Sequence, residues 1–230
     1  MLSDVSVAAD AAASSTRSRL IDAAEQLFAA RGIDGVSLRE INRASGARNA
    51  VAVQYHFADR AGVLRAVLDK HRAPVEASRH AMLDRIEELA RPGVRDLATA
   101  LVRPLAGKLA DPDGGAEFLQ IYAELLNRPR PVFDAATESD ESRSIVRWRR
   151  MVAPHLDEDA LRLHRRFTAI RFTAVELGRR AASAPHTDDR LFVSHLIDLV
   201  TALLTARIGP ETRRLARARD SAAGSSPGDT

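Results

Sequence analysis

The placement of glycine and proline constrains this chain more than any other feature of its sequence. The 12 glycines and 10 prolines gather at a few points and leave long helix-compatible stretches between them. Aromatic residues make up only 4% of the chain, too few for a fold built from many short strands. We therefore expect an all-α protein of about nine to ten helices, arranged as one large domain or two modest ones.

Composition and missing motifs exclude several classes of site. Cysteine is absent, which rules out disulfides, thiolate-ligated zinc and a cysteine nucleophile. The sequence holds no GxxxxGK(S/T), GxGxxG or Glu-x-x-His motif, so we expect no enzyme activity and no cofactor. His164 and His195 have no third ligand at a suitable spacing, so we expect no metal site. The most apolar stretch, residues 191–206, is too short to cross a bilayer and residues 1–16 lack an export signal, which predicts a cytoplasmic protein without a membrane partner.

Apolar periodicity divides the chain into four segments. Residues 1–15 are small and lack periodic apolar anchors, so we expect a disordered arm, and the tail over 212–230 has only Leu215 to bury. Between them we expect a compact helical domain over 16–73 and a larger one over 74–211, with Pro74 kinking or breaking the helix that begins at Asp59. The helices expected in the larger domain cover residues 75–90, 94–110 (with a kink at Pro104), 116–127, 139–152, 157–182 and 189–208.

Residues 16–57 carry start and stop signals for three short helices. Thr16 and Gly32 bound the first helix, and Gly46 ends the second. Ser37 and Glu40 are spaced as a capping box, in which each side chain bonds the other residue's backbone amide. A tight glycine turn between the second and third helices is typical of a helix-turn-helix unit.

The third helix, expected over residues 49–57, has a face suited to a DNA groove. A helical projection turns Ala50, Val53 and Phe57 inward and leaves small and polar residues outside. Val51 is suited to a thymine methyl and Gln54 to adenine, and no acid occurs between Glu40 and Asp59. The alternative is a three-helix structural bundle that never meets DNA.

Two stretches carry a family resemblance, TRSRLIDAAEQLFAARGIDGVSLREINRASG and VQYHFADRAGVLRAVL. They resemble the N-terminal DNA-binding domain of the TetR family of transcriptional regulators. The resemblance implies that Arg39 and the outward side of the third helix read bases, whereas Arg17, Tyr55, His56 and Arg60 hold the backbone. One departure is the eleven steps from Gly46 to Phe57, one more than is common in the family, which leaves open whether Arg48 meets a base or a phosphate. The full set of expected DNA-binding residues is Arg17, Ser37, Arg39, Arg48, Asn49, Val51, Ala52, Gln54, Tyr55, His56 and Arg60.

The same resemblance implies that the C-terminal helices receive a ligand and that the last two long helices pair with a second subunit. Candidate pocket residues are the aromatics Phe118, Tyr122, Trp148, Phe167 and Phe172, although ordinary core packing explains each of them equally well. The apolar stripe of the last helix is wider than one core face needs, and its candidate dimer-interface residues are Leu191, Phe192, His195, Leu196, Leu199 and Leu203. The alternative is that this stripe belongs to an ordinary core helix.

Together these features predict a sequence-specific DNA-binding transcriptional regulator. We expect a homodimeric repressor on a palindromic double-stranded operator, released by a small apolar or amphipathic effector. One alternative is an architectural or scaffold protein that binds DNA without an effector. An all-α enzyme with a vestigial N-terminal domain is the other.

Overall fold

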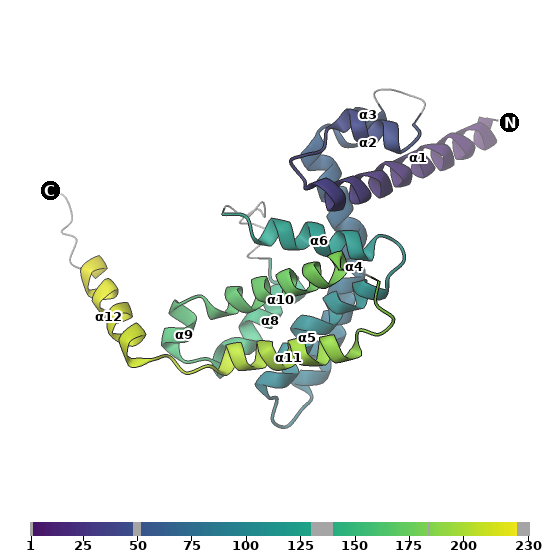
Figure 1. Ribbon diagram of the computed structural model, residues 1–230. Helices are drawn as coiled ribbons and strands as arrows, with labels where there is room; N and C mark the ends of the chain where they lie inside the picture. The colour runs from purple at the N-terminus through teal and green to yellow at the C-terminus, as the bar shows by residue number, and fades with distance from the viewer. Residues whose placement is uncertain (1, 48–51, 130–139, 184, 225–230) are drawn as a thin grey trace.

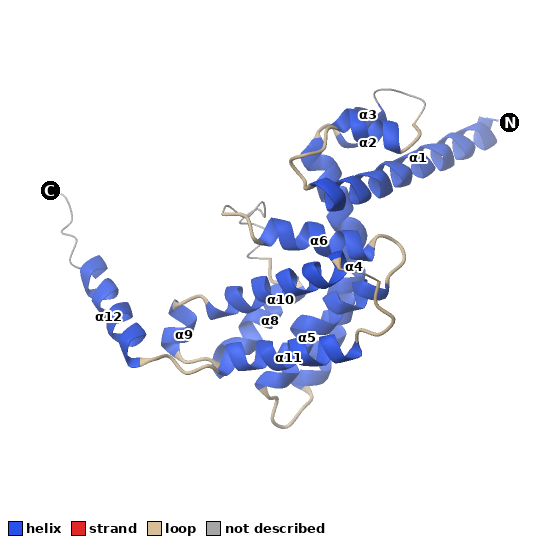
Figure 2. Cartoon of the chain, in the orientation of Figure 1, coloured by secondary structure: helices blue, strands red, loops and turns tan. Residues whose placement is uncertain are grey.

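The computed structural model describes residues 2–47, 52–129, 140–183 and 185–224. Within these ranges the chain forms eleven α-helices and two short 3-10 helices, with no strand (Figure 2). The prediction of an all-α fold is confirmed. The α-helices are α1 (Leu2–Arg31), α2 (Leu38–Ala44), α3 (Ala52–Phe57), α4 (Arg60–Glu87), α5 (Val94–Ala106), α6 (Gly115–Leu126), α8 (Ser144–Val152), α9 (Glu158–Arg162), α10 (Arg165–Ala182), α11 (Arg190–Thr205) and α12 (Pro210–Gly224).

The helices form a small N-terminal unit and a larger body, joined by α4. Figure 1 shows α1, α2 and α3 around the first turns of α4, which then continues into the body. In the body, α10 packs along α6, and α11 packs along α5. Helix α12 extends away from the body at the other end of the molecule (Figure 1).

The core of the N-terminal unit is closed by a helix of the body. Leu20 and Phe28 of α1, Ile41 of α2 and Val53 of α3 are buried together. The same cluster includes two residues of α6, Ile121 and Leu125. The apolar contact between the unit and the body therefore positions α1 against α6.

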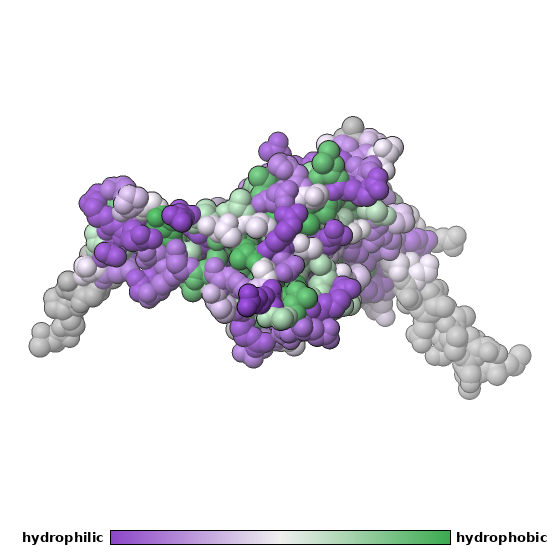
Figure 3. Space-filling view, turned by 90° about the horizontal axis from the view of Figure 1, so that it is seen from below, coloured by the Kyte–Doolittle hydropathy of each residue, from purple (hydrophilic) through white to green (hydrophobic). Residues whose placement is uncertain are grey.

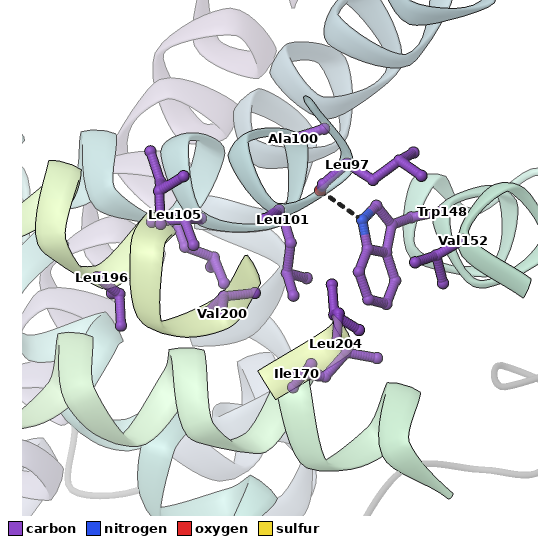
Figure 4. Packing of buried hydrophobic residues seen from close by; sticks show 14 of the residues in the cluster. Leu97, Ala100, Leu101, Leu105, Trp148, Val152, Ile170, Leu196, Val200 and Leu204 are labelled. Carbon is purple, nitrogen blue, oxygen red and sulfur yellow. Dashed lines mark hydrogen bonds between the residues drawn. The ribbon is translucent and has the colours of Figure 1, made fainter. Parts of the chain in front are cut away.

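The main core lies between α4, α5, α8, α10 and α11. Figure 4 shows Trp148 of α8 among leucines and valines of the neighbouring helices, with its indole Nε1 donating a hydrogen bond to the Leu97 carbonyl at 2.7 Å. A buried tryptophan needs a partner for its N–H, and this bond supplies it. On the surface view of Figure 3, several separate apolar patches interrupt the hydrophilic surface of the body.

Two terminal segments differ from the expectation of disorder. Helix α1 begins at Leu2 instead of near residue 16, because residues 2–31 contain many alanines and neither glycine nor proline. At the other end, α12 covers most of the expected tail. Two ion pairs tie it to the neighbourhood of α9, Arg213–Asp159 at 3.0 Å and Arg162–Asp220 at 3.4 Å.

A separate helix beginning after Pro74, expected from a kink or break at that proline, is also corrected. Helix α4 runs through Pro74, although proline inside a helix costs about 3 kcal/mol. Burial of Val67, Val75 and Leu83 on both sides of the proline offsets that cost. Pro104 lies in the last turn of α5, which passes into a 3-10 helix over Gly107–Ala110.

A break appears instead where the sequence predicts one helix over 157–182. His164 takes a left-handed conformation with φ of 56° and separates α9 from α10. Among the described helices, none alone has the length and apolarity to cross a membrane. By those criteria α11 and α12 qualify only as a pair, bent by 57°.

Candidate nucleic-acid interface and ligand cavity

The capping box expected at the start of α2 is present. The Glu40 amide donates to Ser37 Oγ at 3.3 Å, and the Ser37 amide donates to Glu40 Oε2 at 2.9 Å. Hydrogen bonds from the Ser37 backbone and hydroxyl, with help from Arg31 at 2.8 Å, lower the pKa of Glu40 to about 2. The Ser37 hydroxyl, expected at DNA, is thus engaged in fixing the start of α2.

Helix α3 presents the faces that its sequence predicts. Val53 and Phe57 are buried in the N-terminal unit, as expected. Gln54 is exposed, His56 is half-buried, and Tyr55 is 81% exposed with its ring edge against His56. A large aromatic side chain held in solvent on a short, well-anchored helix is available to a partner.

Part of the expected reading surface lies outside the described residues. Arg48, Asn49 and Val51 belong to that part, as does the inward position expected for Ala50. Ala52 opens α3, but its side chain is not among those described. Their contacts with bases therefore stay predictions.

The expected DNA-binding arginines, Arg39 for bases and Arg17 and Arg60 for the backbone, have different surroundings. Arg39 is exposed on α2, together with Arg43, which lies in the stretch without acids. The Arg17 guanidinium lies over the Phe57 ring, 5.2 Å from its centroid. Arg60 instead donates to the Asp34 carbonyl at 3.1 Å and pairs with the Asp34 carboxylate at 3.4 Å. Arg60 therefore holds the loop between α1 and α2, a role that its position after α3 did not indicate.

A charge cluster that is buried at Glu25 and His71 and exposed at Asp22 and Asp113 joins the N-terminal unit to the body. We call Asp22, Glu25, Lys70, His71 and Asp113 the α1–α4 charge cluster. Lys70 Nζ donates to Asp22 at 2.9 Å, Glu25 at 2.9 Å and Asp113 at 2.8 Å, and His71 Nε2 lies 2.6 Å from Glu25 Oε1. Burial opposes the charge of Lys70, yet the three carboxylates raise its pKa above the usual range.

Stacked rings continue this cluster towards a cavity. The His71 ring stacks on Phe118 at 4.6 Å, and Phe118 stacks on Tyr122 at 5.6 Å between centroids. Phe118 and Tyr122 then form one wall of a cavity of about 380 Å³ between α4, α5, α6 and α8. This volume lies within the range of about 300–1,000 Å³ typical of small-molecule sites.

Two of the five expected pocket aromatics therefore line this cavity, and three are corrected. Trp148 is a fully buried core residue, bonded to the Leu97 carbonyl. Phe172 packs against the main core, and Phe167 lies beneath the Arg149 guanidinium at 4.6 Å. Aromatic residues at helical spacing mark buried faces, and spacing alone does not distinguish a filled core from a cavity wall.

Helix α11 divides the expected dimer-interface residues between two faces. Leu191 is 83% exposed, His195 and Leu199 are exposed, and their spacing of four residues places them on one outer face. Phe192 and Leu203 are half-buried. Leu196 is 2% exposed and belongs to the main core of its own subunit, so its assignment to an interface is corrected.

Comparison with known proteins concerns the N-terminal unit. Residues 20–67, from α1 into α4, match the model of a family described as bacterial regulatory proteins, tetR family. Over 66 residues the chain is 41% identical to the HTH-type transcriptional regulator SrpR of Pseudomonas putida, covering 29% of this chain and 30% of that protein. It is also 41% identical over 66 residues to the uncharacterized HTH-type transcriptional regulator TtgW, likewise of Pseudomonas putida, covering 29% of this chain and 48% of the relative. The match thus spans less than half the length of either relative.

Proposed function

We propose that this chain, whose N-terminal unit is similar to the tetR family of bacterial regulatory proteins, is a homodimeric transcriptional regulator that represses from a palindromic operator and is released by a small molecule. The DNA-binding part of this proposal is supported by the orientation of the side chains of α3. Its inner side is anchored by Val53 and Phe57, and its outer side presents Gln54 and Tyr55 in a stretch without acids. Such a helix fits a major groove, where it meets base edges and phosphates without repulsion.

The proposed subunit contact uses the outer face of α11. Leu191 and Leu199 are exposed large apolar residues on one helical face, and a second copy of that face would bury them. A two-fold dimer places two α3 helices about one helical turn of DNA apart, which requires a palindromic site.

The proposed release mechanism follows the rings that connect the cavity to α1. A ligand against Phe118 would displace the stacked His71, which bonds Glu25 of α1. On the other side of α6, Glu124 accepts from the Ile33 amide at 3.2 Å and Arg128 pairs with Asp34 at 2.9 Å. Movement of α6 is thereby coupled to α1 and to the loop that follows α1. The shift between the DNA-binding and released states is limited by the difference in the ligand's affinity for them.

A body without a cavity would favour the alternative of an architectural protein that has no effector. The cavity of about 380 Å³ supports the effector-regulated alternative.

Selection of duplexes from a random pool by the full-length protein tests the proposed function. We expect enrichment of a palindrome whose half-sites lie about one helical turn apart, bound at least about 1,000-fold more tightly than random DNA. The matched control is Arg103→Ala, which removes an exposed cation of α5 far from α3. Failure of the wild-type protein to enrich any sequence would overturn the proposal.

A further inference from the structure

The cavity contains a buried arginine whose hydrogen bonding is incomplete. Arg79 of α4 lines it and is 4% exposed. Its Nη1 donates to the neutral Ser144 hydroxyl at 2.9 Å, whereas its Nε has no hydrogen-bond partner among the described residues. Buried charges in proteins are normally paired, so an arginine in this state is suited to an anion that arrives with a ligand.

We propose that the cavity binds an amphipathic monoanion, with its acidic head group on Arg79 and its apolar part along α4, α5 and α6. The proposal names the ligand class of the site described above, and its regulatory meaning rests on the proposed function.

The surrounding charges favour a single negative charge on the ligand. Arg143 Nε lies 3.4 Å from Glu76 Oε1 without completing a hydrogen bond, and Glu76 Oε2 accepts from the Ser144 amide at 2.5 Å. Burial opposes ionisation of Glu76, but the bonds from Ser144 lower its pKa, so the carboxylate stays charged. Among the inner lining residues, Arg79, Arg143 and Glu76 leave one positive charge to neutralise, whereas Arg65 lines the cavity from an exposed position. A doubly charged head group would be repelled by Glu76.

Among the described residues, Glu76 is the carboxylate whose charge favours that of Arg79, but it accepts its hydrogen bond from the Ser144 amide instead of from the guanidinium. Burial raises the pKa of the Tyr122 hydroxyl, which therefore remains neutral beside Arg79. At the exposed rim, Asp69 is paired with Arg72 at 2.8 Å.

The remaining walls define the apolar part of the ligand. Leu64, Leu68, Leu105, Leu125 and Ile145 line the cavity together with the Phe118 ring. An unbranched or aromatic chain fits such walls, because the apolar surface it buries there needs no hydrogen bonds.

The test is calorimetric titration of the full-length protein with decanoate, 1-decanol and decyl phosphate below their aggregation limits. We expect decanoate to bind at least about ten-fold more tightly than decanol, because hydrogen bonds to a charged group are the stronger ones. Decyl phosphate, when doubly charged, should bind more weakly than decanoate. Equal affinity for decanoate and decanol, or no binding of decanoate, would overturn the proposal without reference to any variant.

Variants locate the preference at one residue. Arg79→Met should abolish the difference between decanoate and decanol while decanol binding is kept, and Arg79→Lys should retain part of it. The matched control is Arg72→Gln, a rim arginine of the same helix, which should leave the difference unchanged. Val75→Phe, which fills the cavity, should weaken both ligands. A preference for decanoate that survives Arg79→Met contradicts the assignment.

The same preparations separate this inference from the proposed function. Operator binding without decanoate binding would reject the ligand class and leave the regulator intact. Binding of decanoate by a protein that selects no DNA would reject the regulator and leave the ligand class standing. Release of operator by decanoate from wild type, but not from Arg79→Met, is the result expected when both hold.

Discussion

The N-terminal unit and the body bury charged side chains in opposite ways. Glu25 of α1 is 1% exposed and receives bonds from both Lys70 and His71. Arg79, also on a buried helix face, has a single neutral partner and a free Nε among the described residues. A satisfied buried charge rigidifies the packing around it, whereas an unsatisfied one keeps a capacity for binding. We infer that Glu25 fixes the N-terminal unit against the body, and that Arg79 belongs to the ligand site.

The largest expected loss of unfolding free energy comes from a substitution of Glu25. Glu25→Gln removes the charge that Lys70 and His71 share, and loss of one partner from a buried ion pair costs about 3–5 kcal/mol of unfolding free energy. The matched control is Asp22→Asn, which touches the same Lys70 amine from a half-exposed position and should cost less than about 1 kcal/mol. Urea unfolding of both variants measures the difference, and equal losses would contradict the structural role assigned to burial.

The next effect concerns the outer surface of the body. Leu199→Glu places a charge in the proposed subunit contact, and desolvating it costs several kcal/mol, enough to give monomers at micromolar concentration. Operator binding should weaken with it. The control, Leu89→Glu, changes an exposed leucine beyond the end of α4 and should leave the dimer intact. Sedimentation is the measurement, and a monomeric wild-type protein would refute the proposed contact.

A smaller effect is expected at the outer surface of the N-terminal unit. Gln54→Ala should reduce discrimination between operator and random DNA by about 1–3 kcal/mol, the usual worth of a base contact. Arg39→Ala serves as a second probe of the same surface. Competition titrations at several salt concentrations separate the two kinds of contact, since loss of a phosphate contact lowers both affinities and the salt slope. If both variants kept the wild-type ratio of operator affinity to random-DNA affinity, the DNA-binding surface would have to lie elsewhere.

Arg79 should respond in the opposite way to Glu25. Arg79→Met replaces a poorly compensated charge by an apolar side chain, so we expect a change in unfolding free energy within about 1 kcal/mol, or a gain. Burial lowers the pKa of this guanidinium, which agrees in direction with a charge that is costly to keep. Ser144→Ala should be destabilising in the wild type and less so beside Arg79→Met. A double-mutant cycle of urea midpoints measures this coupling, and additivity would contradict it.

Local signals were predictable from sequence, and contacts between distant segments were not. Ser37 and Glu40 lie three residues apart, so the chemistry of the two residues determines their pairing. The inward side of α3 followed from periodicity in the same way. Leu196 and Trp148 belong to apolar stripes whose partners the sequence does not reveal, and both face the core instead of an interface or a cavity.

Two features of the candidate sites were indicated less clearly by the sequence. Arg79 stands four residues from Val75 and from Leu83, so it occupies an apolar row and marks an unusual buried charge. The bond between His71 and Glu25 joins residues 46 positions apart and had no local signal. For the same reason the contact of Arg60 with Asp34 was missed, whereas the expected contact of Arg60 with phosphate stays a prediction.

The smallest expected effect concerns Glu40, a glutamate of the same unit whose side chain is more exposed than that of Glu25. Glu40 is held by the neighbouring backbone, and its pKa in the folded protein is about 2 against an ordinary value of 4.5. A carboxyl whose pKa is lowered by folding stabilises the protein fully above 4.5, and this contribution disappears as the pH falls towards 2. The start of α2 should therefore keep its cap at about pH 4, and carbon-13 NMR of the Glu40 carboxyl should show titration near 2. In Ser37→Ala the pKa should rise part of the way towards 4.5, because the hydroxyl is lost while the backbone amide of residue 37 and Arg31 remain, whereas Ser45→Ala, at the other end of α2, should leave it unchanged. Titration of Glu40 near 4.5 in the wild-type protein would show that the cap is open in solution, and the positioning of α2 would then depend on its buried residues Ile41 and Asn42.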